Sequence, residues 1–286
     1  MLSYLQGIVL GILQGVTELF PISSLGHSAI LPRLVGWNID QQSPFFLMFL
    51  VATHSATAIV LLLFFWKDWV RIVSGFFRSI GKRRIEESDS DARLAWLLIV
   101  GTIPAGLVGI SLKHFIREYL LSGMLPSVFL ALNGILLYMA EILRRKASIS
   151  DVKDSDVRIS KMSWWQGFKV GLMQVLALMP GFSRTGSTLA GSLLVGLSHE
   201  DSVRFSFLLS TPIIAAAAAL ELPKLFASGN SAAIGVSVVG GLFAALFSYL
   251  SVKFLTAYFK TENRKLTPFA VYCLIAGLGS LIFFLA

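Results

Sequence analysis

Long apolar runs alternate along the chain with polar connections, and three of these connections are rich in Lys and Arg. An α-helix that crosses a bilayer needs about 20 predominantly apolar residues. Six runs reach that length, and each predicts a transmembrane helix. They lie at about 45–66, 95–112, 123–143, 203–222, 232–256 and 267–286.

Two other apolar stretches, at about 2–36 and 164–198, do not read as simple spans. Pro, Gly and Ser interrupt each of them near its middle. Broken backbone at membrane depth is tolerated only where protein or a water-filled cavity satisfies its polar groups. Each stretch therefore predicts a re-entrant helical hairpin. The fold class expected is an all-α integral membrane protein with six transmembrane helices and two such hairpins.

Composition supports a membrane protein and excludes other classes. Apolar residues make up 55% of the chain and charged residues only 14%, whereas a soluble domain is about one quarter charged. The chain has a single cysteine, Cys273, so a disulfide framework is excluded. The net charge of +8 does not indicate nucleic acid, because the excess lies in connections between apolar runs, where it sets topology.

The basic connections predict the orientation of the chain. Most of the Lys and Arg residues fall in three loops, 67–94, 144–163 and 257–266. Cytoplasmic loops carry such an excess, so these three are expected on the cytoplasmic side of the membrane. Threading the spans through that assignment puts both termini outside. The first hairpin then enters from the outer side and the second from the cytoplasmic side.

The two interrupted stretches also resemble each other, which indicates an internal repeat. Pro21 and Ser24 of the first correspond to Pro180 and Ser183 of the second, and the residues before them match as Gly7, Gly11 and Gln14 with Gly167, Gly171 and Gln174. Opposite entry makes this an inverted-topology repeat, a plan in which broken helices meet near the midplane. Residues 1–286 are thus expected to form one domain. Repeat 1 (1–143) and repeat 2 (164–286) are joined by the cytoplasmic loop 144–163.

Each interrupted stretch offers groups that bind anions. Ser23 or Ser24 can cap one helix after the break, and Ser183 can cap another. The free N–H groups and the dipole at a helix N-terminus attract negative charge, and the forked guanidinium of Arg184 suits phosphate oxygens. The predicted ligand is a phosphate or diphosphate. Its expected contacts are Ser23, Ser183, Thr185, Gly186, Ser187 and Thr188.

Glu18 and His27 extend this prediction from binding to catalysis. A carboxylate beside phosphate is expected where a divalent cation or a proton transfer is involved. Glu18, helped by Gln14, could hold Mg²⁺ or Ca²⁺ or orient a water. Ser24 with His27 is a candidate nucleophile and base; the alternative is a water activated by His27 or Glu18. For His54, inside the run 45–66, an interhelical hydrogen bond is expected.

These two motifs resemble those of a known family, the bacterial undecaprenyl-diphosphate phosphatases of the bacitracin-resistance type. The first motif stands here as Gln14, Glu18, Pro21, Ser23, Ser24, Gly26 and His27, and the second as Pro180, Gly181, Ser183, Arg184, Thr185, Gly186 and Thr188. Many members of the family have Glu where this chain has Gln14, and Ser where it has Thr185. The two motifs stand in the family's order, and the resemblance covers essentially the whole chain.

The resemblance implies a hydrolase with a divalent cation that removes the terminal phosphate of undecaprenyl diphosphate. The reaction would occur on the outer, periplasmic side of the inner membrane. It would recycle the lipid carrier of cell-wall (peptidoglycan) synthesis and give bacitracin tolerance. The expected partners are the polyprenyl diphosphate and membrane lipid, with no nucleic acid; a homodimer is left open. The main alternative is a transporter or flippase of a phosphate-bearing lipid or small anion, because inverted repeats with broken helices are a transporter plan.

Overall fold

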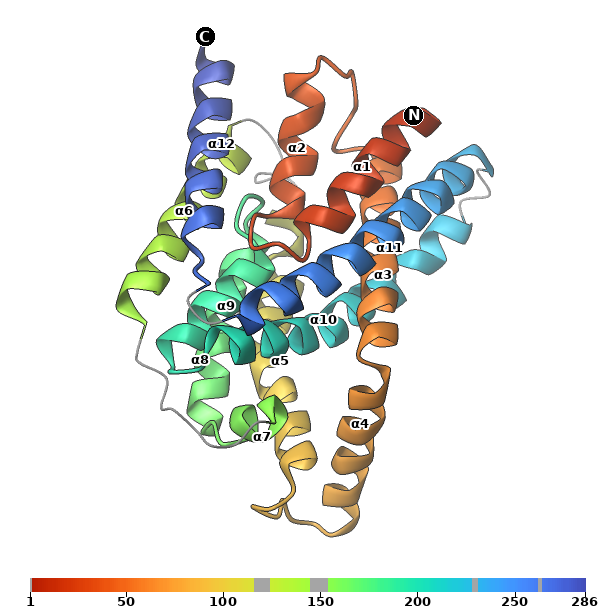
Figure 1. The fold of residues 1–286 in the computed structure, drawn as a ribbon. Coiled ribbons are helices and arrows are strands. Elements are labelled where there is room, and N and C mark those ends of the chain that lie inside the picture. Colours follow the sequence, from red (N-terminus) through yellow and green to blue (C-terminus); the bar gives the residue numbers. More distant parts are fainter. Residues whose placement is uncertain (1, 116–123, 145–153, 228–230, 262–263) are drawn as a thin grey trace.

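The computed structural model describes residues 2–115, 124–144, 154–227, 231–261 and 264–286. Within those ranges every named element is a helix, which confirms the all-α class (Figure 1). The elements are α1 (Tyr4–Thr17), α2 (Ser24–Leu34), α3 (Pro44–Phe64), α4 (Trp66–Gly81), α5 (Ser90–Phe115), α6 (Leu125–Leu143), α7 (Ser155–Ser160), α8 (Trp164–Val175), the short 3₁₀ helix η2 (Leu176–Leu178), α9 (Arg184–Leu194), α10 (His199–Ala227), α11 (Ser231–Lys260) and α12 (Thr267–Leu285).

Six of the described helices are long and apolar enough to cross a membrane. They are α3, α5, α6, α10, α11 and α12, and they coincide with the six apolar runs. The predicted number and placement of membrane helices are therefore confirmed. The chain is a multi-pass membrane protein.

The two interrupted stretches fold into pairs of short helices. Both α1 and α8 begin with a capping box, formed by Ser3 with Gln6 and by Ser163 with Gln166. Because a helix rises 1.5 Å per residue, their 14 and 12 residues are too short for a bilayer core of about 30 Å. The chain then turns and continues as α2 or α9. That these helix pairs are re-entrant hairpins, and the side from which each enters the membrane, stay predictions.

The two halves of the chain pack on each other reciprocally. Helix α1 lies against α11, and α8 lies against α5. A methyl group on Gly11 would come within 2.3 Å of the carbonyl oxygen of Gly240, and one on Gly171 within 2.4 Å of that of Gly101. Only glycine permits such close backbones. Each of these short helices thus packs on a long helix of the other half, and the inverted repeat stays a prediction.

The first basic loop contains a helix that the sequence analysis missed. Residues 67–94 were predicted to be a loop, but α4 occupies Trp66–Gly81. Its apolar residues recur at helical spacing, as in Trp69, Ile72 and Phe76, and this stripe packs against α5 while charged residues face outward. In the loop 144–163, α7 forms at its end; residues 145–153 lie outside the described part of the chain.

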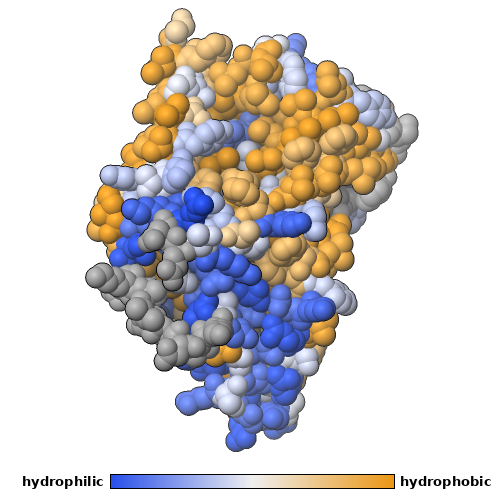
Figure 2. All heavy atoms as spheres, viewed as in Figure 1, coloured by the Kyte–Doolittle hydropathy of each residue, from blue (hydrophilic) through white to orange (hydrophobic). Residues whose placement is uncertain are grey.

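Charged residues gather at one end of the molecule. Asp156 of α7 accepts hydrogen bonds from Arg71 Nη2 at 2.8 Å and from Arg204 Nε at 2.6 Å, so it joins α4, α7 and α10. Figure 2 shows mainly polar residues in this lower part and a mainly apolar surface above it. Both termini lie at the opposite end from the tip of α4 (Figure 1).

Candidate active site

The two interrupted segments meet in the interior of the protein. A methyl group on Gly26 would lie 2.9 Å from the Cα atom of Gly181. Asn133 of α6 is fully buried and fixes both segments: its Nδ2 donates to Pro21 O at 3.0 Å, and its Oδ1 accepts from Ser183 N at 3.0 Å. One side chain of a membrane helix therefore sets the distance between the two helix N-termini.

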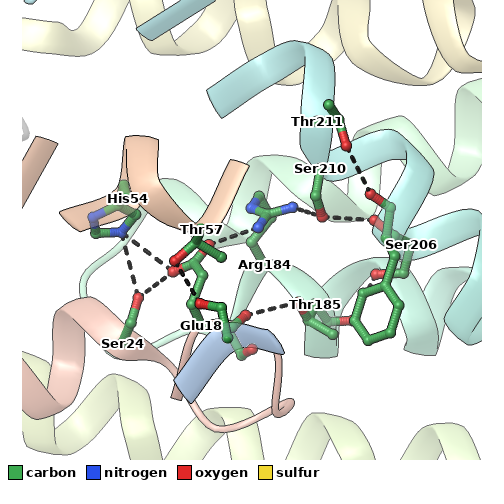
Figure 3. A network of polar contacts seen from close by, with 12 residues as sticks. Glu18, Ser24, His54, Thr57, Arg184, Thr185, Ser206, Ser210 and Thr211 are labelled. Atoms are coloured by element: carbon green, nitrogen blue, oxygen red, sulfur yellow. Dashed lines mark hydrogen bonds and ion pairs between the residues drawn. The ribbon is translucent and has the colours of Figure 1, made fainter. Parts of the chain in front are cut away.

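Glu18 is the centre of a buried polar cluster (Figure 3). It caps the C-terminus of α1 and is 6% exposed. Arg184 Nη2 donates to its Oε1 at 2.6 Å, and Gln14 Nε2 donates to its Oε2 at 3.2 Å. A carboxylate at the negative end of a helix and out of water is unfavourable. The Arg184 charge compensates it, so the two halves of the chain are joined here by an ion pair.

Ser24 and His54 complete the cluster around the same carboxylate oxygen. Ser24 Oγ donates to Glu18 Oε2 in a short hydrogen bond. His54 Nε2 lies 3.2 Å from that oxygen and 3.4 Å from Ser24 Oγ, while its Nδ1 donates to Leu50 O at 2.7 Å. The contacts place a hydroxyl against a carboxylate and a histidine against both, which is the pattern expected of an activated hydroxyl.

His54 was missed as a site residue. The predicted interhelical hydrogen bond is present, because His54 on α3 contacts a residue at the end of α1 and one at the start of α2. Its partners, however, are Glu18 and Ser24. The available signal was a histidine in an apolar run with three hydroxyl residues close by, at Thr53, Ser55 and Thr57, since ionisable groups in a membrane helix commonly mark function.

His27 does not lie beside Ser24, so the predicted Ser24–His27 pair is not formed. Its Nδ1 lies 2.6 Å from Ser23 O, one turn earlier, and its Nε2 lies 2.7 Å from Tyr272 Oη. The ring stacks on that tyrosine at 5.7 Å between centroids. These contacts turn the imidazole toward α12, whereas Ser24 faces α3.

Arg184 is held at its second nitrogen by hydroxyl groups of α10. Nη1 donates to Ser210 Oγ, and Ser210 donates to Ser206 O at 2.6 Å (Figure 3). Ser206 in turn contacts Thr188 Oγ1. The sequence analysis missed this row, although Ser206 and Ser210 lie one helical turn apart within an apolar run and so share a face.

Two of the predicted phosphate contacts, Ser23 and Ser183, are helix caps that line the cavity described below. Ser23 Oγ accepts from Gly26 N at 3.2 Å, and Ser183 Oγ accepts from Gly186 N at 3.1 Å. Ser23 has φ +71°, which is strained for a residue with a side chain. Since both caps line the cavity, α2 and α9 each begin at its wall.

Three other predicted contacts point into the protein instead. Thr185 Oγ1 donates to Glu18 O at 3.0 Å, Thr188 Oγ1 donates to Arg184 O at 2.9 Å, and Ser187 is fully buried. None of the three is among the residues that line the cavity. Helix periodicity explains this, because α9 turns their side chains toward α1 and α10. Of the predicted α9 side-chain contacts, Arg184 alone lines the cavity.

The cluster forms the polar end of a cavity of about 610 Å³. Glu18, Ser24, His54 and Arg184 lie at that end. The remaining walls are largely apolar and come from α3, the turn before α9, α5 and α10; they include Leu47, Met48, Val51, Leu178, Phe182, Ile213 and Ile214. The shape suits a molecule with an anionic head and an apolar tail.

The residues fit a divalent cation that is held partly by the substrate. Among the described residues, no group of three His, Cys, Asp or Glu side chains could hold a metal ion. Mg²⁺, however, is usually bound through one or two carboxylates together with substrate phosphates. Glu18 supplies one carboxylate, and the Oε1 atom of Gln14 is buried beside it without a hydrogen-bond partner. That orphaned oxygen is a suitable second ligand.

Known proteins are similar to this chain over nearly its whole length. The family model described as "Bacitracin resistance protein BacA" matches residues 7–279. A protein of Mycolicibacterium paratuberculosis named undecaprenyl-diphosphatase is 47% identical over 98% of this chain and 97% of its own length. Undecaprenyl-diphosphatase 2 of Chromobacterium violaceum is 43% identical over 99% of both chains. With that match and those identities, the chain belongs to the bacitracin resistance protein BacA family.

Proposed function

We propose that the protein hydrolyses undecaprenyl diphosphate to undecaprenyl phosphate and inorganic phosphate. The observation that carries this proposal is the contact of Ser24 with Glu18, beside His54 and Arg184, at the polar end of an apolar cavity. The names of the relatives support the same reaction. Such an enzyme recycles the lipid carrier for cell-wall synthesis and confers bacitracin tolerance.

The reaction begins with attack by Ser24. Its Oγ forms a bond to the terminal phosphorus, the bridging P–O bond breaks, and undecaprenyl phosphate leaves. Glu18 Oε2 takes the Ser24 proton, since it already accepts that hydrogen bond. His54 and Gln14 hold the carboxylate in position. Water then attacks the phosphoserine and the Oγ–P bond breaks. Glu18 returns its proton to Ser24 Oγ, and the water leaves as part of inorganic phosphate, which keeps its protons.

Charge on the transferring phosphoryl group is stabilised by fixed donors. Arg184 keeps guanidinium N–H groups for the phosphates beyond the two that bond Glu18 and Ser210. The N-termini of α2 and α9 add backbone N–H groups and the positive ends of two helix dipoles. These donors are prearranged in a buried site, where such stabilisation is strongest.

A divalent cation, Mg²⁺ or Ca²⁺, would be held by Glu18, by Gln14 Oε1 and by the phosphates. Once bound, it would neutralise phosphate charge. The groups of the site all come from one chain, so the proposal does not need a second copy. The alternative of a transporter or flippase finds no support among the relatives, whose names are those of diphosphatases.

The site is proposed to open to the outer side of a bacterial inner membrane, with both termini on that side. The charged end formed by α4 and α7 would then be cytoplasmic, in line with the excess of Lys and Arg on that side. The termini lie at the other end of the molecule (Figure 1). Labelling of a single cysteine placed at the tip of α4 should succeed only from the cytoplasmic side.

The function is tested by phosphate release from protein purified and reconstituted in nanodiscs. Undecaprenyl diphosphate should yield one phosphate per lipid, and undecaprenyl phosphate should yield none. The reason is that loss of phosphate from the monophosphate would expel an alkoxide, a far poorer leaving group than a phosphate. If no phosphate is released at any Mg²⁺ or Ca²⁺ concentration, the proposal is wrong.

The two histidines should differ in their effect on the reaction. We expect His54→Ala to lower kcat by about 100-fold, because it removes a donor that orients a catalytic carboxylate. His54→Gln should recover part of the loss, since its amide can still donate to Glu18. His27→Phe retains the stacking on Tyr272 and should change kcat by less than about threefold, because the contacts of His27 are with Ser23 O and Tyr272 rather than Ser24 or Glu18. A larger loss of kcat in His27→Phe than in His54→Ala would instead make His27 the base.

A second carboxylate should tighten cation binding. In Gln14→Glu, the Mg²⁺ concentration for half-maximal activity should fall by about tenfold, because Mg²⁺ prefers carboxylate oxygens. Activity in a chelator should fall, since two buried carboxylates repel each other without a cation. Mn²⁺ binding followed by electron paramagnetic resonance gives a readout independent of turnover. Gln174→Glu is the matched control in the second segment; an equal shift there would contradict a cation site at Gln14.

A further inference from the structure

A second hollow lies between α4 and α5 and is almost purely apolar. Its volume is about 490 Å³. Its walls include Trp69, Ile72 and Phe76 of α4 with Leu98, Ile103 and Gly106 of α5. The one hydroxyl in its lining, Thr102 Oγ1, donates to Leu98 O at 2.7 Å and is thereby satisfied. Apart from Trp69 Nε1, which is buried without a hydrogen-bond partner, the side chains that line this α4–α5 groove are apolar or already satisfied.

The α4–α5 groove adjoins the active-site cavity. On α5, Ala105 lines the cavity and the next residue, Gly106, lines the groove. On α10, Pro212 lines the groove and Ile213 lines the cavity. The two hollows therefore lie on either side of the place where α5 and α10 approach each other.

A proline stands in each helix at this place, Pro104 in α5 and Pro212 in α10. A proline inside a helix removes one backbone hydrogen bond and bends the axis. Each helix is therefore expected to bend here, where α5 and α10 contact each other. The outer edge of the groove is open to lipid, since Ile103 is 46% and Ile110 76% exposed.

We propose that the α4–α5 groove holds the distal prenyl units of the substrate. This inference rests on the proposed function and specifies where the tail of the same substrate lies. A cavity of about 610 Å³ is the size of a site for a drug-sized ligand, whereas an undecaprenyl chain has eleven prenyl units. The chain must therefore leave the cavity, and the adjoining groove is apolar and open at its side.

Gly106 provides a way to fill the groove without disturbing the fold. A methyl group at this position would meet no atom within 4 Å. A Trp side chain there would project into the space that the tail occupies. Gly279 of α12 is equally open, with nothing within 4 Å of an added methyl group, and it lines neither hollow. Gly279→Trp is thus a matched control on another helix.

The experiment compares two substrates in nanodiscs, undecaprenyl diphosphate and farnesyl diphosphate, which has three prenyl units. Gly106→Trp should lower kcat/KM for the long substrate by about tenfold, mainly through KM. The effect is moderate because the tail exchanges lipid contacts for protein contacts. Values for farnesyl diphosphate, and both values in Gly279→Trp, should stay as in the unaltered protein. The inference would be overturned if Gly106→Trp left kcat/KM for undecaprenyl diphosphate unchanged. It would also be overturned if the variant lost the same factor on both substrates.

Photocrosslinking keeps the test valid if Gly106→Trp fails to fold. A polyprenyl diphosphate with a photoreactive group at the far end of its tail should label Val73 or Phe76 of α4, and unlabelled undecaprenyl diphosphate should compete. Labelling on α11 or α12 instead would overturn the inference. So would labelling of α4 that the diphosphate does not reduce, since the occupant would then be bulk lipid. Absence of phosphate release by the unaltered protein would contradict the proposed function instead.

Discussion

Replacing Ser24 with Ala is expected to lower kcat for undecaprenyl diphosphate by about 10⁴-fold or more, which is the scale for loss of a nucleophile. The Ser24 hydroxyl is buried and bonded to Glu18, whereas the Ser23 and Ser183 hydroxyls at the same cavity cap their own helices. The substrate should still bind, because Arg184 and the two helix N-termini remain. Phosphate release and substrate binding, measured on the same preparation, would separate the two effects.

Ser28→Ala is the matched control for this change. Ser28 lies one turn further along α2, and its buried hydroxyl has no hydrogen-bond partner among the described residues. Its loss should leave kcat nearly unchanged. A phosphorylated Ser24, trapped by rapid acid quenching of the unaltered enzyme and located by mass spectrometry, would support covalent catalysis. Full activity of Ser24→Ala would make water the nucleophile.

Glu18→Gln should lower kcat by about 10³-fold, within the range for removal of a general base. The amide has the same shape but cannot accept the Ser24 proton. KM should stay the same or fall, because the change removes a negative charge from an anion site and frees Arg184 from its ion pair. A rise in KM with kcat preserved would instead restrict Glu18 to substrate binding.

Loss of a buried charge also affects stability, so this variant needs its own control. Glu141→Gln makes the same change in another buried carboxylate, one that accepts hydrogen bonds from Leu266 N at 3.0 Å and lies 2.9 Å from His199 Nε2. Breaking a buried ion pair costs about 3–5 kcal/mol. We expect both variants to unfold at a lower temperature. Only Glu18→Gln should lose turnover.

Much of the fold and part of the site followed from the sequence. Apolar run length alone placed the six membrane helices, because a bilayer of fixed thickness imposes one helix length. Glu18, Ser24 and Arg184 were predicted from local motifs, since each follows or precedes a proline break in a short segment. The structure brings these three together through the ion pair and the Ser24 hydrogen bond.

The features that the sequence analysis missed depend on packing between distant segments. His54 becomes a site residue because α3 packs beside α1 and α2, and the polar residues next to it in the sequence do not reveal those partners. The rotation of His27 toward Tyr272 is set by a residue 245 positions away. Asn133 lies within an apolar run, and its joining of both broken segments could not be predicted from spacing.

The reciprocal contact of α1 with α11 and of α8 with α5 has a consequence for how the protein is made. When the first half of the chain leaves the ribosome, the glycine face of α1 has no partner, since Gly240 is synthesised much later. The first hairpin must wait in the translocon or in lipid until α11 is inserted. Neither half can therefore complete its own fold. Until the last helices are synthesised, proteases that degrade unfolded membrane proteins would act on the incomplete chain.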